Sequence, residues 1–185
     1  MSWWESVKRW FGGADEPVPQ TSDEPVEAAG WDAIDAAFRG FYGKPEAGHL
    51  AHDGVRAMHD LNEPPAYPLD GISIWDAGTH WHYVGFGMSE LYGKDSDDPE
   101  VSGWGYEPCL RLARGDEDTP PVWPARLLQS LCQAQWSLPV LEPGHTLRTG
   151  RAIEDADIEG FLWVEDPDLG TIDTPHGRVT FLLAV

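Results

Sequence analysis

Short runs of β-branched and aromatic residues, separated by turn-forming residues, dominate the chain from residue 69 to Val185. The runs have the length and composition of strands and read "LDGISIW", "HWHYVGFGM", "WGYEPCLRLAR", "HTLRT", "GFLWV" and "RVTFLLAV". The residues "DAGT" between the first two runs predict a hairpin turn, and "EDPDLG" and "DTPHG" predict later turns. Because these strands do not alternate regularly with helices, the pattern predicts an α+β fold with a mixed, mostly antiparallel β-sheet flanked by α-helices.

Two segments have the apolar periodicity of helices. The first, "GWDAIDAAFRGFYG", ends in a glycine suited to helix termination, Gly43, and has an apolar face of Trp31, Ile34, Phe38 and Phe41. The second, "WPARLLQSLCQAQWSL", has Pro124 in its first turn and a predicted buried stripe of Leu127, Leu128, Leu131, Ala134 and Leu138. Both helices are therefore expected to pack on the sheet.

Pro108 and the two cysteines, Cys109 and Cys132, are unusual within these elements. A proline cannot donate a ladder hydrogen bond, so Pro108 predicts an edge strand or a bulge. Two cysteines do not form a disulfide framework, and we expect both thiols to be reduced. Cys132 lies on the side of a predicted helix, where a small apolar role is more common than a nucleophilic one.

The first 29 residues differ from the rest of the chain. Trp3, Trp4, Val7, Trp10 and Phe11 recur at helical spacing, and residues 12–29 are rich in Gly, Pro, Asp and Glu, which is typical of a linker. We therefore expect residues 1–29 to be an amphipathic segment with an acidic flexible linker, and residues 30–185 to form the domain. Charge interrupts the opening residues and no apolar run could span a membrane, so the expected location is the cytoplasm.

The composition is strongly acidic. The chain has 32 Asp and Glu residues against 12 Lys and Arg residues, for a formal net charge of −20. Phosphate binding needs a basic surface, which disfavours nucleic acid as a direct partner. A basic protein would instead be attracted to this surface, although high negative charge also serves solubility.

The residues provide little evidence of catalysis. The sequence has no nucleophile elbow, phosphate loop or dinucleotide-binding fingerprint. His80 and His82 would project from the same face of a strand and could begin a metal site, but no other histidine has a diagnostic spacing to them. The acids Asp166, Asp168 and Asp173 lack the spacing of a calcium loop and are better explained as solvated loop charge.

Four long blocks, in order, resemble a known family. The blocks are "PLDGISIW", "HWHYVGFGMSELYGKDSDDPEVSGWGYE", "RLARGDEDTPPVWPARLLQSL" and "EDPDLGTIDTPHGRVTFLLAV". They are similar to the Suppressor of fused domain in its bacterial single-domain form, over residues 69–185. The resemblance implies an α+β domain without enzymatic activity or cofactor, which acts by binding proteins.

The resemblance also implies a binding surface. Animal members hold a peptide of Gli transcription factors between two lobes, and from its length we expect this chain to lack the second lobe. The tyrosine of the family's "LYG" segment, near the peptide-binding surface, corresponds to Tyr92. The acidic loop that follows corresponds to Asp95, Asp97, Asp98 and Glu100. Bacterial relatives have been proposed as immunity proteins that neutralise polymorphic toxins.

These observations leave three hypotheses. The first is a non-enzymatic binding module, most concretely an immunity or antitoxin-like protein that occludes a basic toxin or another protein through Tyr92 and the acidic loop. The second is a metal-dependent enzyme that uses His80 and His82. The third is a scaffold that is recruited through its tryptophan-rich N-terminal helix.

Overall fold

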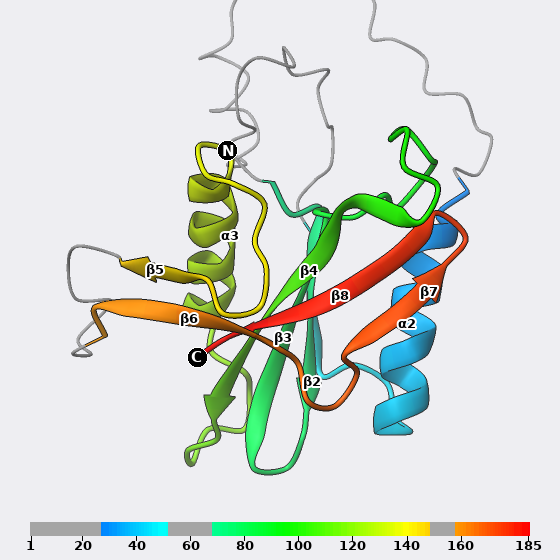
Figure 1. Ribbon diagram of the computed structural model, residues 1–185. Helices are drawn as coiled ribbons and strands as arrows, with labels where there is room; N and C mark the ends of the chain where they lie inside the picture. The colour runs from blue at the N-terminus through cyan, green and yellow to red at the C-terminus, as the bar shows by residue number, and fades with distance from the viewer. Residues whose placement is uncertain (1–26, 52–67, 149–157) are drawn as a thin grey trace, which may run out of the picture.

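The computed structural model describes residues 27–51, 68–148 and 158–185 (Figure 1). Its elements are α2 (Ala29–Tyr42), β1 (Gly48–Ala51), β2 (Gly71–Asp76), β3 (His80–Phe86), β4 (Val101–Ala113), α3 (Trp123–Gln135), β5 (Thr146–Arg148), β6 (Gly160–Glu165), β7 (Thr171–Thr174) and β8 (Gly177–Ala184). The predicted N-terminal helix and residues 12–26 of the predicted linker lie outside these ranges. No helix in the described ranges is both long and apolar enough to cross a membrane.

The strands form one mixed sheet. Their order is β1-β2-β3-β4-β8-β6-β5, and β7 pairs with β8 beside that path. The β4–β8 pair is parallel, whereas the other recorded pairs are antiparallel. This confirms the predicted fold class and all six predicted strand regions. The strands β1 and β7, each four residues long, were not predicted, because such short segments carry too little periodicity.

The two faces of the sheet bury two separate apolar clusters. Alternation along β3 directs Val84 into the cluster beneath α2, whereas Trp81 and Tyr83 enter the cluster beneath α3. The ring of His82 lies on the α2 side, 5.6 Å from the ring of Phe38. The strand therefore divides between two faces, as strand alternation requires, and Figure 1 shows the two helices on opposite sides of the central strands.

The helix α2 is anchored by the residues that its periodicity predicts, with one exception. Ile34 and Phe38 are fully buried, and Gly43 caps the helix in the left-handed conformation, donating its N–H to the carbonyl of Arg39. Phe41 was expected on the apolar face but is 47% exposed. Its neighbour Tyr42 packs inward instead and stacks on Trp75.

The buried stripe of α3 is shifted from the predicted one. Leu128 and Leu131 are buried as expected, together with Cys132. Ala134 is exposed, and Leu138 is 43% exposed because the helix ends at Gln135. The buried side-chain amide of Gln135 instead donates to the carbonyl of Pro139, which closes the helix end.

Pro108 predicted an edge strand or a bulge, and the edge-strand alternative is wrong. The strand β4 lies inside the sheet, between β3 and β8. Pro108 immediately precedes Cys109, whose pairing with Val84 is the terminal recorded β3–β4 pair, so its missing N–H falls where that ladder ends. Its ring packs against Gly85, where an added Cβ would lie 2.7 Å from Pro108 Cγ. The register irregularity in β4 occurs earlier, between Val101 and Tyr106.

Candidate functional site: the β3–β4 loop

The candidate site is the long connection between β3 and β4, residues 87–100, which we call the β3–β4 loop. It lies at one end of the sheet with the N-terminal end of α2 and the turn between β7 and β8 (Figure 1). The amide of Trp104 donates to Met88 O over 2.9 Å, and the amide of Arg178 donates to Glu100 O over 2.8 Å. Both ends of the loop are therefore attached to the sheet.

The start of the loop is held by a buried carboxylate, Glu107 on β4. This side chain is fully buried, and its Oε1 accepts hydrogen bonds from Gly87 N at 2.9 Å and from Ser89 N and Oγ at 2.9 and 2.6 Å. Its Oε2 lies 3.2 Å from Met88 N and 3.2 Å from Gly87 N. Burial raises the pKa of Glu107 to about 7, against the lowering effect of these hydrogen bonds.

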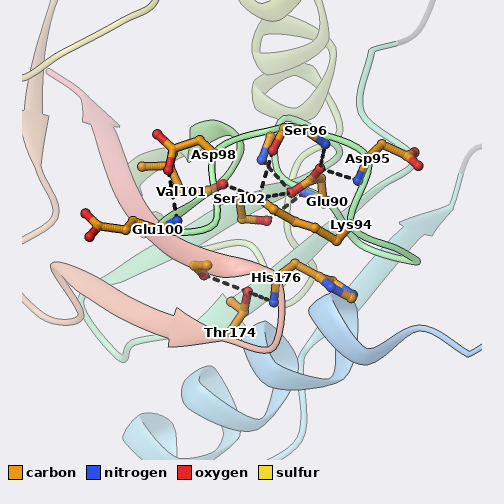
Figure 2. Close-up of polar contacts among 12 residues, drawn as sticks. Glu90, Lys94, Asp95, Ser96, Asp98, Glu100, Val101, Ser102, Thr174 and His176 are labelled. Carbon is orange, nitrogen blue, oxygen red and sulfur yellow. Dashed lines mark hydrogen bonds and ion pairs between the residues drawn. The ribbon is translucent and has the colours of Figure 1, made fainter.

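A second carboxylate, Glu90, organises the middle of the loop (Figure 2). Its Oε1 accepts from the amides of Asp95 and Ser96 at 2.6 and 2.5 Å, and its Oε2 accepts from Gly103 N at 3.0 Å and Lys94 Nζ at 2.9 Å. Burial alone would raise the pKa of Glu90, but the hydrogen bonds outweigh it and lower the pKa to about 2. Glu90 therefore stays ionised and bonded at any ordinary pH.

The amino end of α2 supports the loop from the side. The amides of Gly30 and Trp31 donate to the carbonyl of Leu91 over 3.0 and 3.2 Å, so the loop satisfies N–H groups that a helix start leaves without intrahelical partners. A Cβ added at Gly30 would lie 2.2 Å from Glu90 O. Only glycine allows this close approach between the helix and the loop.

The predicted partner-binding residues all lie on this supported loop. Tyr92 is 43% exposed and follows the buried Leu91. The side chains of the four acids are exposed: Asp95, Asp97, Asp98 and Glu100. Figure 2 shows the carboxylates of Asp98 and Glu100 pointing to one side of the loop and that of Asp95 to the other. These three labelled carboxylates therefore do not converge on a single point, and we call the four exposed acids of the loop its acidic rim.

The predicted pair His80 and His82 lies elsewhere, on the sheet face beside the end of α2. His82 is fully buried, with Tyr42 Oη 2.7 Å from its Nδ1, and burial lowers the pKa of its imidazole well below the ordinary value. Its Nε2 lies 3.4 Å from Asp166 Oδ2. Because the imidazole is neutral, we interpret this contact as polar packing and not as an ion pair.

An arginine supplies the positive charge beside these histidines. Arg111 Nη2 donates to Asp166 Oδ2 at 2.7 Å and to Asp168 Oδ2 at 2.6 Å. The interpretation of Asp166 as solvated loop charge is wrong, because its side chain is fully buried and paired with this arginine. Within residues 27–51, 68–148 and 158–185, no group of three or more His, Cys, Asp or Glu side chains could hold a metal ion.

Sequence reasoning missed the two glutamates that hold the loop. Glu107 lies in a strand, and Glu90 precedes Leu91 without any motif that marks its role. One signal was present, since a glutamate inside an apolar strand is rarely buried unless it is paired or hydrogen-bonded. Its partners come from residues 87–89, about twenty positions earlier, which the sequence alone could not identify.

Comparisons with known proteins give a consistent result. The family model described as Suppressor of fused protein (SUFU) matches residues 65–185. Suppressor of fused homologues from Homo sapiens and Mus musculus are each 34% identical over 142 residues, and each match covers 64% of this chain and 28% of the relative. The chain thus spans less than a third of the length of these relatives.

Solved structures share the fold. The crystal structure of a Sufu–Fu complex aligns with a TM-score of 0.74 and 26% identity, covering 86% of this chain and 75% of that one. The crystal structure of Drosophila Suppressor of Fused aligns with a TM-score of 0.71 and 26% identity, covering 86% of this chain and 42% of that one. The structural likeness therefore covers most of this chain.

Proposed function

Because the chain belongs to the Suppressor of fused family, we propose that it is a non-enzymatic protein-binding module whose main contact surface is the β3–β4 loop. One observation carries this proposal: two carboxylates and a helix end hold the loop in one shape while Tyr92 and the acids stay exposed. A loop that is ordered before binding loses less conformational entropy when a partner docks. One related solved structure is a Sufu–Fu complex, which supports a protein as the partner.

The charge of the chain favours a basic partner. The formal net charge is −20, and the acidic rim extends this charge into the loop. Complementary charge accelerates association, whereas a few buried aromatic anchors usually supply most of the affinity. In this proposal Asp95, Asp97, Asp98 and Glu100 attract the partner, and Tyr92 is the anchor.

The most concrete form of the proposal is an immunity or antitoxin-like protein of the bacterial single-domain type. Such a protein would act in the cytoplasm and occlude the active site of a basic toxin, without chemistry of its own. Residues 30–185 would form the binding domain, and residues 1–29 an appended segment.

Affinity capture from the native cell, with matched variants, tests the proposal. The test variant replaces the four rim acids (Asp95→Asn, Asp97→Asn, Asp98→Asn and Glu100→Gln). The control variant removes two exposed acids of another loop, Asp116→Asn and Asp118→Asn. We expect wild type and control to retain the same basic protein and the test variant to lose it. Equal capture by all three proteins would refute the loop as the contact surface.

The two other hypotheses are separated by simple controls. The scaffold hypothesis predicts that a chain beginning at residue 27 loses the partner, whereas the loop proposal predicts that it keeps the partner. The metal-dependent enzyme hypothesis predicts near-stoichiometric zinc, iron or manganese in protein purified without an affinity tag. The surroundings of His80 and His82 give that hypothesis no support, because Arg111 already pairs with the neighbouring Asp166 and Asp168.

A further inference from the structure

Glu107 differs from every other acid near the loop, because it is fully buried and yet has no cation among its recorded partners. Each of its recorded hydrogen-bond partners donates to the carboxylate. These partners are the amides of Gly87, Met88 and Ser89, and the Ser89 hydroxyl. A carboxylate suits this set of donors because all its lone pairs accept. A protonated carboxyl group does not, since one oxygen then carries a hydrogen that faces N–H groups.

We infer that Glu107 is a positioning residue: its ionised carboxylate holds residues 87–89, and protonation of this one group loosens the β3–β4 loop. The inference rests on the proposed function of the loop, which it extends to regulation by pH. The two oxygens respond unequally. A proton on Oε2 conflicts with the amides of Met88 and Gly87, which lie 3.2 Å away, and leaves the shorter bonds at Oε1 in place. The loop is therefore loosened at its start and not released.

The loosening reaches the binding surface through the backbone. Ser89, held by Glu107, is followed directly by Glu90, whose carboxylate holds Asp95 and Ser96. Glu90 N also donates to Ser102 Oγ at 2.9 Å, and Trp104 N donates to Met88 O. A shift of residues 87–89 therefore moves the residue around which the rest of the loop is organised.

Among the titratable groups recorded as interacting with Glu107, it is the one that changes charge near neutral pH. Tyr106 and Cys109 on β4 and Cys132 on α3 interact with it electrostatically, and burial raises the pKa of each, so all three stay neutral. Glu90 in the loop has a pKa of about 2 and stays ionised. The raised pKa of Glu107, about 7, supports a transition in this range.

Nuclear magnetic resonance of the protein alone, from about pH 5.5 to about pH 8.5, tests the inference. We expect the amide signals of Gly87, Met88 and Ser89 to shift in one step with a midpoint near the pKa of Glu107. Amide protection of residues 90–96, corrected for intrinsic exchange, should fall about tenfold below the midpoint. In the Glu107→Gln variant the amide signals should show no step, and residues 90–96 should have the reduced protection at every pH. The control Glu142→Gln changes an exposed residue and should behave as wild type.

A second variant keeps the test decisive if Glu107→Gln fails to fold. Ser89→Ala removes a hydrogen bond that favours the ionised carboxylate, so its midpoint should move upward. An unchanged midpoint in Ser89→Ala, or protection that stays constant through the wild-type step, overturns the inference. Neither measurement involves a partner. Failure here therefore leaves the proposed function intact, and failure of the capture experiment leaves the titration of Glu107 intact.

Discussion

The amide of Gly30, in the first turn of α2, donates a hydrogen bond to the carbonyl of Leu91 in the β3–β4 loop over 3.0 Å. The two residues are far apart in the sequence, and each supplies what the other element lacks. The helix start has N–H groups without intrahelical partners, and the loop has a carbonyl outside any ladder. This contact joins the helix that covers one sheet face to the loop that we propose as the binding surface.

Gly30→Ala is predicted to destabilise the protein by about 2 kcal/mol or more, because the new Cβ overlaps Glu90 O at 2.2 Å. Gly40 is the matched control in the same helix, since a Cβ there meets nothing within 4 Å. Gly40→Ala should stabilise by about 0.5–1 kcal/mol through helix propensity. Urea unfolding measures both changes. A Gly30→Ala protein as stable as Gly40→Ala would show that the contact is dispensable.

Arg111→Met is predicted to cost about 3–5 kcal/mol, because it leaves the buried carboxylate of Asp166 without its cation. Arg126→Met, on the exposed side of α3, is the control and should change stability by less than about 0.5 kcal/mol. Thermal and urea unfolding of the two variants provide the measurement. Similar stability of both would mean that Asp166 does not depend on this pairing.

The free energy of unfolding should depend on pH through Glu107, with a definite sign. In the unfolded chain this group loses its proton near its ordinary pKa of 4.5, whereas the folded protein holds the proton up to about pH 7. Between these values the folded state binds more protons, so stability falls as pH rises, by about 3 kcal/mol in total. The difference in the free energy of unfolding between wild type and Glu107→Gln should fall over the same pH range and become constant above about pH 7. A difference that rises with pH contradicts the assignment.

Tyr92→Ala is predicted to weaken partner binding by about 2 kcal/mol, as expected for an aromatic anchor. Because Tyr92 is 43% exposed, the free energy of unfolding should change by less than about 1 kcal/mol. Phe41→Ala removes another exposed aromatic, on α2, and should leave binding unchanged. Calorimetric titration with the captured partner distinguishes them. Equal loss in both variants would mean that Tyr92 has no special role.

The salt dependence of association should come from the rim acids. We expect association of the wild type to slow as ionic strength rises, and association of the four-acid variant to be slower at low salt and less sensitive to salt. The Asp116→Asn and Asp118→Asn control should keep the wild-type slope. Stopped-flow or surface-based kinetics at several salt concentrations measures these slopes. Wild-type kinetics in the four-acid variant would exclude electrostatic attraction by the rim.

The sequence by itself determined the fold class, the six main strand regions, the two helices and the division of β3 between two faces. These features follow from local periodicity and composition, which act over a few residues. The loop that carries Tyr92 was indicated by the resemblance to the Suppressor of fused family and not by local pattern. Local pattern could not detect β1 and β7, which are too short, or the interior position of β4, which depends on the pairing of β4 with β8.

Only the tertiary structure decided how the loop is held and how the polar residues of the sheet are used. Glu107 meets residues 87–89, Gly30 meets Leu91, and Arg111 meets Asp166 across separations that no local pattern records. The physical reason is that a buried charge or amide must find a partner wherever the fold brings one. Considered from its local sequence alone, Asp166 suggests solvated loop charge, and Glu107 suggests an ordinary glutamate in a strand.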